Sequence, residues 1–216
     1  MLILLFWPML LLIFLGALAI GSLLSWLLSS PGEKTTKIVI LGPSGSGKTE
    51  LWYALQRKVR SSYSNTGNET IEKFLLGEKS DGTKVYVEKG LDIGGTNLYA
   101  TKYYKTLITQ GTFVYFLLDI TQVKDENYKE PFIQFVKVLS VFEEIGKGYG
   151  CGYEILATHA DEDRTKGEGD VRDYFALLQK KKYGGVDLSK LNIRVVSLKD
   201  SYDLEKIRQE ILCSVN

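Results

Sequence analysis

The stretch Gly42-Pro43-Ser44-Gly45-Ser46-Gly47-Lys48-Thr49 matches the pattern G-x-x-x-x-G-K-[ST]. It follows the apolar, β-branched run 37–41 (KIVIL), a predicted strand, and precedes a predicted helix over 50–59. In this pattern the glycines let successive backbone N–H groups turn toward phosphates, and the helix N-terminus adds partial positive charge. Lys48 would reach the β- and γ-phosphates, and the Thr49 hydroxyl would bind Mg²⁺. The stretch therefore predicts a phosphate-binding loop, and it does not choose between ATP and GTP.

Strand and helix patterns alternate along the rest of the chain. Predicted strands cover 71–76, 84–88, 113–119, 153–157 and 193–196, and predicted helices cover 131–147, 171–182 and 204–212. The turn signal Ser80-Asp81-Gly82 makes the first two of these strands an antiparallel hairpin. KIVIL has no polar face, as expected for a strand of a parallel sheet covered on both sides. The sequence predicts an α/β P-loop NTPase domain with a mostly parallel, doubly wound, six-stranded sheet and its ligand at the carboxyl ends of the strands.

Charge divides the chain into two parts. The 216 residues include 27 Lys+Arg and 26 Asp+Glu, and none of these precedes Glu33. The apolar run 2–28 would reach about 40 Å as a helix, more than the roughly 30 Å hydrocarbon core of a bilayer. Lys34 and Lys37 follow this run, so the positive-inside rule places its C-terminal side in the cytosol. We expect a single-pass transmembrane anchor over 1–29, a linker over 30–36 and a cytosolic domain over 37–216.

Other readings of the N-terminal run stay open, and other classes of protein are excluded. A cleaved signal peptide could end near Ala17-Leu18-Ala19, although no basic residue precedes this site, and a buried core helix is a further alternative. Cys151 and Cys213 are too few for a secreted disulfide scaffold. A net charge of +1 gives no reason to expect direct nucleic-acid binding. The composition also excludes a multipass transporter and a disordered tail protein.

Asp92-Ile93-Gly94-Gly95-Thr96 follows the second hairpin strand and fits D-x-x-G. In this pattern the aspartate holds Mg²⁺ through water, and the backbone N–H of the last glycine senses the γ-phosphate. Asp92 and Gly95 are therefore candidates for these two roles.

Two later segments resemble guanine-reading motifs. Thr158-His159-Ala160-Asp161 resembles [NT]-K-x-D, in which the carboxylate accepts hydrogen bonds from guanine N1 and N2. Ser197-Leu198-Lys199 resembles the S-A-K loop, whose middle backbone N–H meets guanine O6. Each segment follows a predicted strand, so all four motifs are expected at one edge of the sheet.

With four motifs in this order, residues 37–216 resemble the small Ras-like GTPases, specifically the branch containing Arf proteins and signal recognition particle receptor β subunits. The D-x-G-G form of 92–95 and the segment 116–121 (FLLDIT), which looks like the branch's V-x-D-x-T, carry the Arf-like detail. A membrane span just ahead of the first strand is typical of the receptor β subunits. The resemblance implies a G domain that binds GTP or GDP with Mg²⁺ at a membrane, the endoplasmic reticulum if the source is eukaryotic. Its partner would be the receptor α subunit, recruited for co-translational protein targeting.

Two residues depart from the family pattern. His159 replaces the lysine that packs along the base, so guanine affinity is expected to be lower. Thr96 stands where Arf and Ras proteins carry the glutamine that orients the attacking water, so intrinsic hydrolysis is expected to be very slow, with an activator or partner supplying what is missing. The switch I threonine, a further Mg²⁺ ligand, is expected to be Thr66, with Thr70 as the alternative.

The resemblance thus assigns catalytic positions to Gly95 and Thr96 and Mg²⁺ ligands to Thr49, Thr66 and Asp92. The predicted nucleotide-binding residues are Gly42, Pro43, Ser44, Gly45, Ser46, Gly47, Lys48, Thr49, Thr66, Asp92, Gly95, Thr158, His159, Asp161, Ser197, Leu198 and Lys199.

Three other functions remain. The chain could be another Arf-like membrane GTPase, or a membrane scaffold whose nucleotide is never turned over. It could also be a membrane-tethered P-loop ATPase or kinase with Asp119 on Mg²⁺. Against an ATP-using enzyme, the sequence has no LSGGQ-like signature, no evident acidic catalytic residue after Asp119 and no arginine-rich lid.

Overall fold

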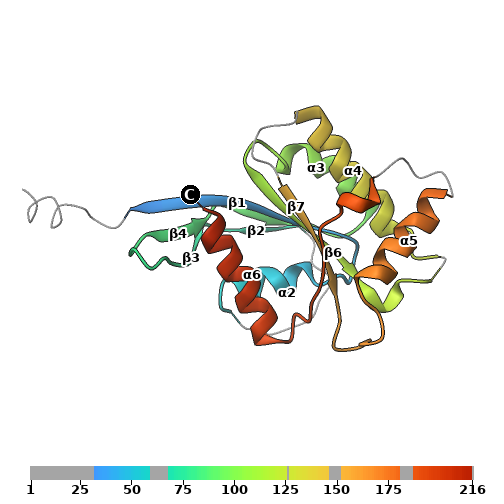
Figure 1. Cartoon of the computed structure of the whole chain (residues 1–216). Helices are drawn as coiled ribbons and strands as arrows, with labels where there is room; N and C mark the ends of the chain where they lie inside the picture. Colours follow the sequence, from blue (N-terminus) through green and yellow to red (C-terminus); the bar gives the residue numbers. More distant parts are fainter. Residues whose placement is uncertain (1–31, 59–67, 126, 146–151, 181–186, 216) are drawn as a thin grey trace, which may run out of the picture.

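The central strand β1 (Glu33–Leu41) is buried on both faces over its second half. Ile38 and Ile40 pack into one hydrophobic cluster, and Val39 and Leu41 pack into another on the opposite side of the sheet. This alternation follows from the two-residue repeat of a strand. The computed structural model in Figure 1 describes residues 32–58, 68–125, 127–145, 152–180 and 187–215.

A six-stranded sheet has the order β3-β4-β1-β6-β7-β8. Its other strands are β3 (Phe74–Glu78), β4 (Lys84–Val87), β6 (Thr112–Asp119), β7 (Gly152–Thr158) and β8 (Ile193–Val195). All neighbouring strands are parallel except β3 and β4. The predicted α/β class, the mostly parallel six-stranded sheet and the antiparallel hairpin are confirmed.

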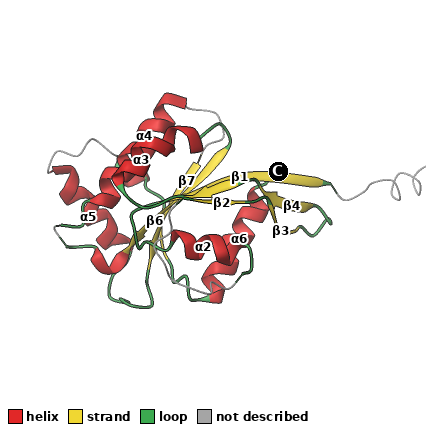
Figure 2. Cartoon of the chain, turned by 180° about the vertical axis from the view of Figure 1, so that it is seen from behind, coloured by secondary structure: helices red, strands yellow, loops and turns green. Residues whose placement is uncertain are grey.

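Helices cover both faces of the sheet (Figures 1 and 2). Helices α2 (Lys48–Leu55) and α6 (Ser201–Ser214) lie on the face of Ile38 and Ile40. Helices α3 (Asn97–Leu107), α4 (Glu130–Ile145) and α5 (Glu168–Lys180) lie on the face of Val39 and Leu41. The arrangement is compatible with a P-loop NTPase fold.

Several elements differ from the sequence-based prediction. The predicted strand 71–76 is divided: β2 (Glu69–Ile71) pairs with β5 (Gly90–Asp92) in a separate two-stranded sheet, and only β3 pairs with β4. Strand β1 begins at Glu33 because residues 33–36 pair with β4, so it includes part of the predicted linker. Helix α3 and the 3-10 turns η1 (Ile120–Gln122) and η2 (Leu188–Lys190) were not predicted.

The predicted transmembrane run 2–28 lies outside the described residues. Within the part of the chain that the structure describes, no helix is long and apolar enough to cross a bilayer.

Trp52 provides a test of the packing on the α2 face. Its side chain is fully buried in the cluster with Ile38 and Ile40 and meets the Phe74 ring edge-on at 6.5 Å. Trp52→Ala should lower the free energy of unfolding by about 3–5 kcal/mol, because the substitution removes buried apolar area and leaves a cavity. Urea unfolding of the full chain in mild detergent, followed by circular dichroism, measures this loss. Tyr202→Ala, at a side chain that is 72% exposed, should change stability by less than about 0.5 kcal/mol. Equal losses in the two variants would contradict the packing.

Candidate functional site

The phosphate-loop motif and the two base-reading segments lie at the same edge of the six-stranded sheet because they follow parallel strands. The expectation that all four motifs follow strands of this sheet is wrong for D-x-x-G, because Asp92 ends β5, which pairs with β2 in the separate two-stranded sheet. The phosphate-loop motif follows β1, and Asp119, Thr158 and Ser197 lie at or just after the ends of β6, β7 and β8. Strand β1 lies between β4 and β6, so the chain connections on its two sides run in opposite directions. The loop therefore occupies the topological switch point at which α/β sheets bind ligands.

The phosphate-loop motif forms a compact turn that leads directly into α2. Gly47 adopts φ 89°, a left-handed conformation that favours glycine, and α2 begins at the next residue. Gly47 has no side chain with which to cap the first turn of α2, so the amides of that turn are suited to bind an anion. Ser46 closes the turn, since its hydroxyl donates to the Pro43 carbonyl at 2.9 Å.

Lys48 folds back over this loop. Its ammonium donates to the Pro43 carbonyl at 2.8 Å, and the residue is only 7% exposed. Burial lowers the pKa of Lys48 to about 8, and the nearby Asp92 carboxylate opposes that shift. The loop thus holds a largely desolvated cation beside the amides of α2, an arrangement that suits phosphate oxygens.

Thr49 and Asp92 bring two potential magnesium ligands together. The Thr49 hydroxyl donates to Asp92 Oδ2 at 2.6 Å, and Asp92, at the end of β5, is 1% exposed. A hydroxyl and a carboxylate are hard oxygen ligands of the kind that Mg²⁺ prefers alongside water and substrate phosphates. The pair therefore fits the predicted Mg²⁺ site. No group of three or more His, Cys, Asp or Glu residues suited to another metal lies within the described ranges.

Gly95 lies directly against the phosphate loop. A methyl group at its Cα would clash with the Pro43–Ser44 peptide, so only glycine fits this close approach. Thr96 follows as the N-cap residue of α3, is exposed, and makes no side-chain capping hydrogen bond. The structure thus places Gly95 against the Pro43–Ser44 peptide of the loop, with Thr96 next to it at the start of α3.

The end of β7 is tied to the phosphate loop through Thr158. Its hydroxyl is 3.0 Å from the Ser46 carbonyl and 2.9 Å from the Leu118 carbonyl, and it is fully buried. His159 adopts φ 63°, and its Nδ1 lies 2.9 Å from the Thr158 hydroxyl and 3.6 Å from Asp119 Oδ1. The two residues link the predicted base-reading segment to the loop and to β6.

Asp161 is the centre of a polar cluster that joins the two base-reading segments. It accepts hydrogen bonds from the Ser197 hydroxyl at 3.0 Å and from the Lys199 ammonium at 2.8 Å, and Lys199 also pairs with Glu162 at 3.0 Å. The Lys199 hydrogen bond lowers the pKa of Asp161 below its ordinary value, with a smaller contribution from Ser197. The Leu198 side chain contacts Gly47, so this cluster borders the phosphate loop.

Asp119 is engaged by the turn that follows it. Oδ1 accepts from the Thr121 backbone N–H at 2.9 Å and from the Thr121 hydroxyl at 2.7 Å, while Oδ2 accepts from Gln122 Nε2 at 2.7 Å. Thr49 pairs with Asp92, and this contact makes Asp92 the better candidate for a metal ligand near the loop.

The structure describes one of the two candidate switch I threonines, Thr70, and not the other, Thr66. Thr66 lies outside the described residues. Thr70 is exposed in β2, opposite Leu91 of β5, so it lies on the strand that borders Asp92.

Sequence reasoning missed two buried polar side chains next to Gly95. Gln134 of α4 donates to the Gly95 carbonyl at 2.8 Å, and Tyr104 of α3 donates to Gln134 Oε1 at 3.2 Å. The sequence offered one signal for Gln134, a polar residue between Phe132 and Phe135 in a predicted helix.

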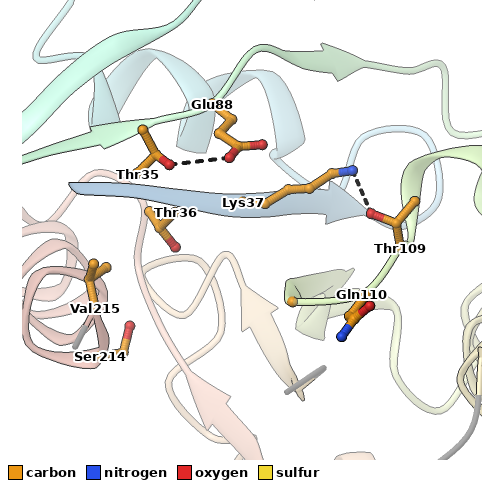
Figure 3. Close-up of a pocket in the computed structure, with 9 residues that line it drawn as sticks. Thr35, Thr36, Lys37, Glu88, Thr109, Gln110, Ser214 and Val215 are labelled. Atoms are coloured by element: carbon orange, nitrogen blue, oxygen red, sulfur yellow. Dashed lines mark hydrogen bonds between the residues drawn. The ribbon is translucent and has the colours of Figure 1, made fainter. Parts of the chain in front are cut away.

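A separate hollow lies at the amino-terminal half of β1, away from the phosphate loop (Figure 3). In it Lys37 donates to the Thr109 hydroxyl at 2.7 Å, and Thr35 donates to Glu88 at 3.3 Å. These hydrogen bonds pair four of its polar side chains, and it contains none of the predicted site residues.

The chain matches no protein-family model and no curated protein. The fold and the loop therefore define its class as an α/β domain with a P-loop-like phosphate-binding motif.

The lowered pKa of Lys48 predicts a pH dependence of stability. Between pH 8 and pH 10.5, the ordinary pKa of lysine, Lys48 keeps its proton in the unfolded chain but has lost it in the folded chain. The free energy of unfolding therefore rises with pH over this range. The rise attributable to Lys48 should total about 3 kcal/mol across this window and be absent from Lys48→Met. Urea unfolding in nucleotide-free, Mg²⁺-free buffer at pH 7.5, 9 and 10.5 measures the difference. The exposed-lysine control Lys58→Met should follow the wild-type profile, and a matching profile for Lys48→Met would refute the assignment.

Proposed function

We propose that this chain is a Mg²⁺-dependent guanine-nucleotide-binding switch. The observation that carries the proposal is the Thr158 hydroxyl beside the Ser46 carbonyl, 112 residues apart in sequence. This contact joins a phosphate-binding loop to a segment of the guanine-reading type. A glycine-rich turn without a nucleotide-binding role would not be expected to make this contact with a segment of the guanine-reading type.

Each part of the site has a distinct role in the proposed binding. The amides at the start of α2 and the Lys48 ammonium would bind the phosphates, whose negative charge would favour the protonated form of Lys48. Thr49 and Asp92 would hold Mg²⁺, which when bound neutralises charge on the β- and γ-phosphates. The Gly95 backbone, placed against the loop, would contact the γ-phosphate.

Base selection would rest on Asp161. Its carboxylate would accept hydrogen bonds from guanine N1 and N2, donors that adenine does not present in this arrangement. The bonds from Ser197 and Lys199 keep Asp161 ionised and orient it. A base that presents no donors at these positions would form neither hydrogen bond, so the site would favour guanine over adenine.

Hydrolysis is proposed to be slow in the isolated chain. Thr96 is too short to orient an attacking water as a glutamine does, and its exposed position gives it no second group with which to do so. Slow hydrolysis is compatible with a switch. A switch requires only that the triphosphate-bound and diphosphate-bound conformations differ, and γ-phosphate contacts produce such a difference by ordering the neighbouring loops.

The location and partner follow from the resemblance to signal recognition particle receptor β subunits. Residues 2–28 would anchor the chain in the membrane, the endoplasmic reticulum if the source is eukaryotic, with the G domain in the cytosol. The GTP state would recruit a receptor α-like subunit in co-translational targeting. Another Arf-like membrane GTPase is the nearest alternative, and the contacts of Asp119 with Thr121 and Gln122 do not favour the ATPase or kinase alternative.

Asp161→Asn tests the proposed base reader. An amide donates where the carboxylate accepted, so preference should move from guanine to xanthine nucleotides by at least about a hundredfold. Equilibrium competition of GTP, XTP and ATP against a fluorescent GTP analogue, using the full chain with Mg²⁺, measures this preference. Glu162→Gln is the matched control, since Glu162 also pairs with Lys199 but lies outside the base-reading position. Preference for ATP that ignores Asp161 would overturn the proposal.

Thr96→Gln tests the reason for slow hydrolysis. Restoring a side chain that can orient water should raise the single-turnover rate of GTP hydrolysis by about tenfold or more, while Thr96→Ala should leave it unchanged. Phosphate release from preloaded GTP measures both rates. Rapid wild-type hydrolysis that Thr96→Ala abolishes would show that Thr96 itself is catalytic.

A further inference from the structure

Gln134 is a fully buried amide with both ends hydrogen-bonded. Its Nε2 donates to the Gly95 carbonyl at 2.8 Å, and its Oε1 accepts from the Tyr104 hydroxyl at 3.2 Å. The neighbouring side chains on α4, Phe132 and Phe135, are also fully buried. A polar side chain in such a cluster is costly unless it is paired, and here the two partners fix which way the amide faces.

Tyr104 extends this connection to the phosphate loop. The residue is 2% exposed, and burial raises the pKa of its phenol far above the ordinary value, while a backbone hydrogen bond from Gly42 opposes the rise. Gly42 is the first residue of the phosphate loop, so the Tyr104 phenol lies near the start of that loop, and its hydrogen bond to Gln134 connects it to Gly95.

Gly95 is therefore held from two sides. The Pro43–Ser44 peptide lies against its Cα, and Gln134 holds the carbonyl of the peptide that joins Gly95 to Thr96. The backbone at Gly95 thus lies close to the phosphate loop, and a side chain of α4 holds its carbonyl. The first contact joins two of the sequence motifs, whereas Gln134 belongs to none of them.

We propose that Gln134, supported by Tyr104, is a positioning residue that holds Gly95 against the phosphate loop and so favours nucleoside triphosphate over diphosphate. This inference rests on the proposed function. A diphosphate has no γ-phosphate for Gly95 to contact, so loss of the restraint should weaken triphosphate binding and leave diphosphate binding unchanged. A purely structural role would alter thermal stability without changing the ratio of the two affinities.

The experiment measures dissociation constants for GTPγS and GDP, with Mg²⁺, in the full chain. Gln134→Met keeps the length of the side chain and removes both hydrogen bonds, and the ratio of GTPγS to GDP affinity should fall about three- to tenfold, the range for one hydrogen bond. Tyr104→Phe removes only the hydroxyl and should lower the ratio less. If Gln134→Met does not melt cooperatively and so is not folded, the Tyr104→Phe variant alone is used to test the inference.

Phe135→Leu is the matched control, because it loosens the same helix contact without touching Gly95. It should lower the melting temperature and leave the affinity ratio at the wild-type value. If Gln134→Met and Tyr104→Phe both keep the wild-type ratio of GTPγS to GDP affinity, or show a higher one, this inference is wrong but the proposed function stands. Equal wild-type affinity for GTPγS and GDP would lead to the same conclusion. A wild-type chain that binds neither guanine nucleotide would instead refute the proposed function.

Discussion

The largely buried ammonium of Lys48 is the constraint around which the loop end of the sheet is arranged. A charge removed from water requires polar partners, and these come from different parts of the chain. The Pro43 carbonyl accepts its hydrogen bond, and the Asp92 carboxylate lies near enough to oppose the loss of its proton. Asp92 in turn accepts from the Thr49 hydroxyl, so the loop, the start of α2 and the end of β5 are joined by one charged group. A bound anion would add an opposite charge beside the Lys48 ammonium and so stabilise this desolvated cation.

The elements around this site could be predicted where a short stretch of consecutive residues determines the structure. KIVIL and the phosphate-loop motif together predicted a buried parallel strand, a turn and a helix, and β1, Gly47 and α2 follow that order. The motifs after β6, β7 and β8 were also located correctly, because parallel strands place their carboxyl ends at one edge. Short, continuous apolar runs that end at loop residues carried this information without any knowledge of tertiary contacts.

The features that sequence reasoning missed depend on distant contacts. Residues 71–76 have the composition of one strand, yet Ile71 pairs with Gly90 while Phe74 pairs with Val87, so two partners divide the run. Helix α3 begins directly after a motif whose glycines favour a loop, and its buried Tyr104 hydrogen-bonds Gln134 of α4. Gln134 has a polar side chain at an apolar position, and only the approach of the Gly95 carbonyl explains it.

The same contacts separate two tasks that a nucleotide switch must perform. Gly95 is confined by the Pro43–Ser44 peptide and by Gln134, whereas Thr96, one residue later, is exposed at the start of α3. Recognition of a γ-phosphate requires a backbone group held in one place, and orientation of water requires a long polar side chain that can reach it. Gly95 has a backbone held in this way, and Thr96 has too short a side chain for the second task. On the proposed function, this combination favours a protein that remains in its triphosphate state until another molecule supplies the missing group.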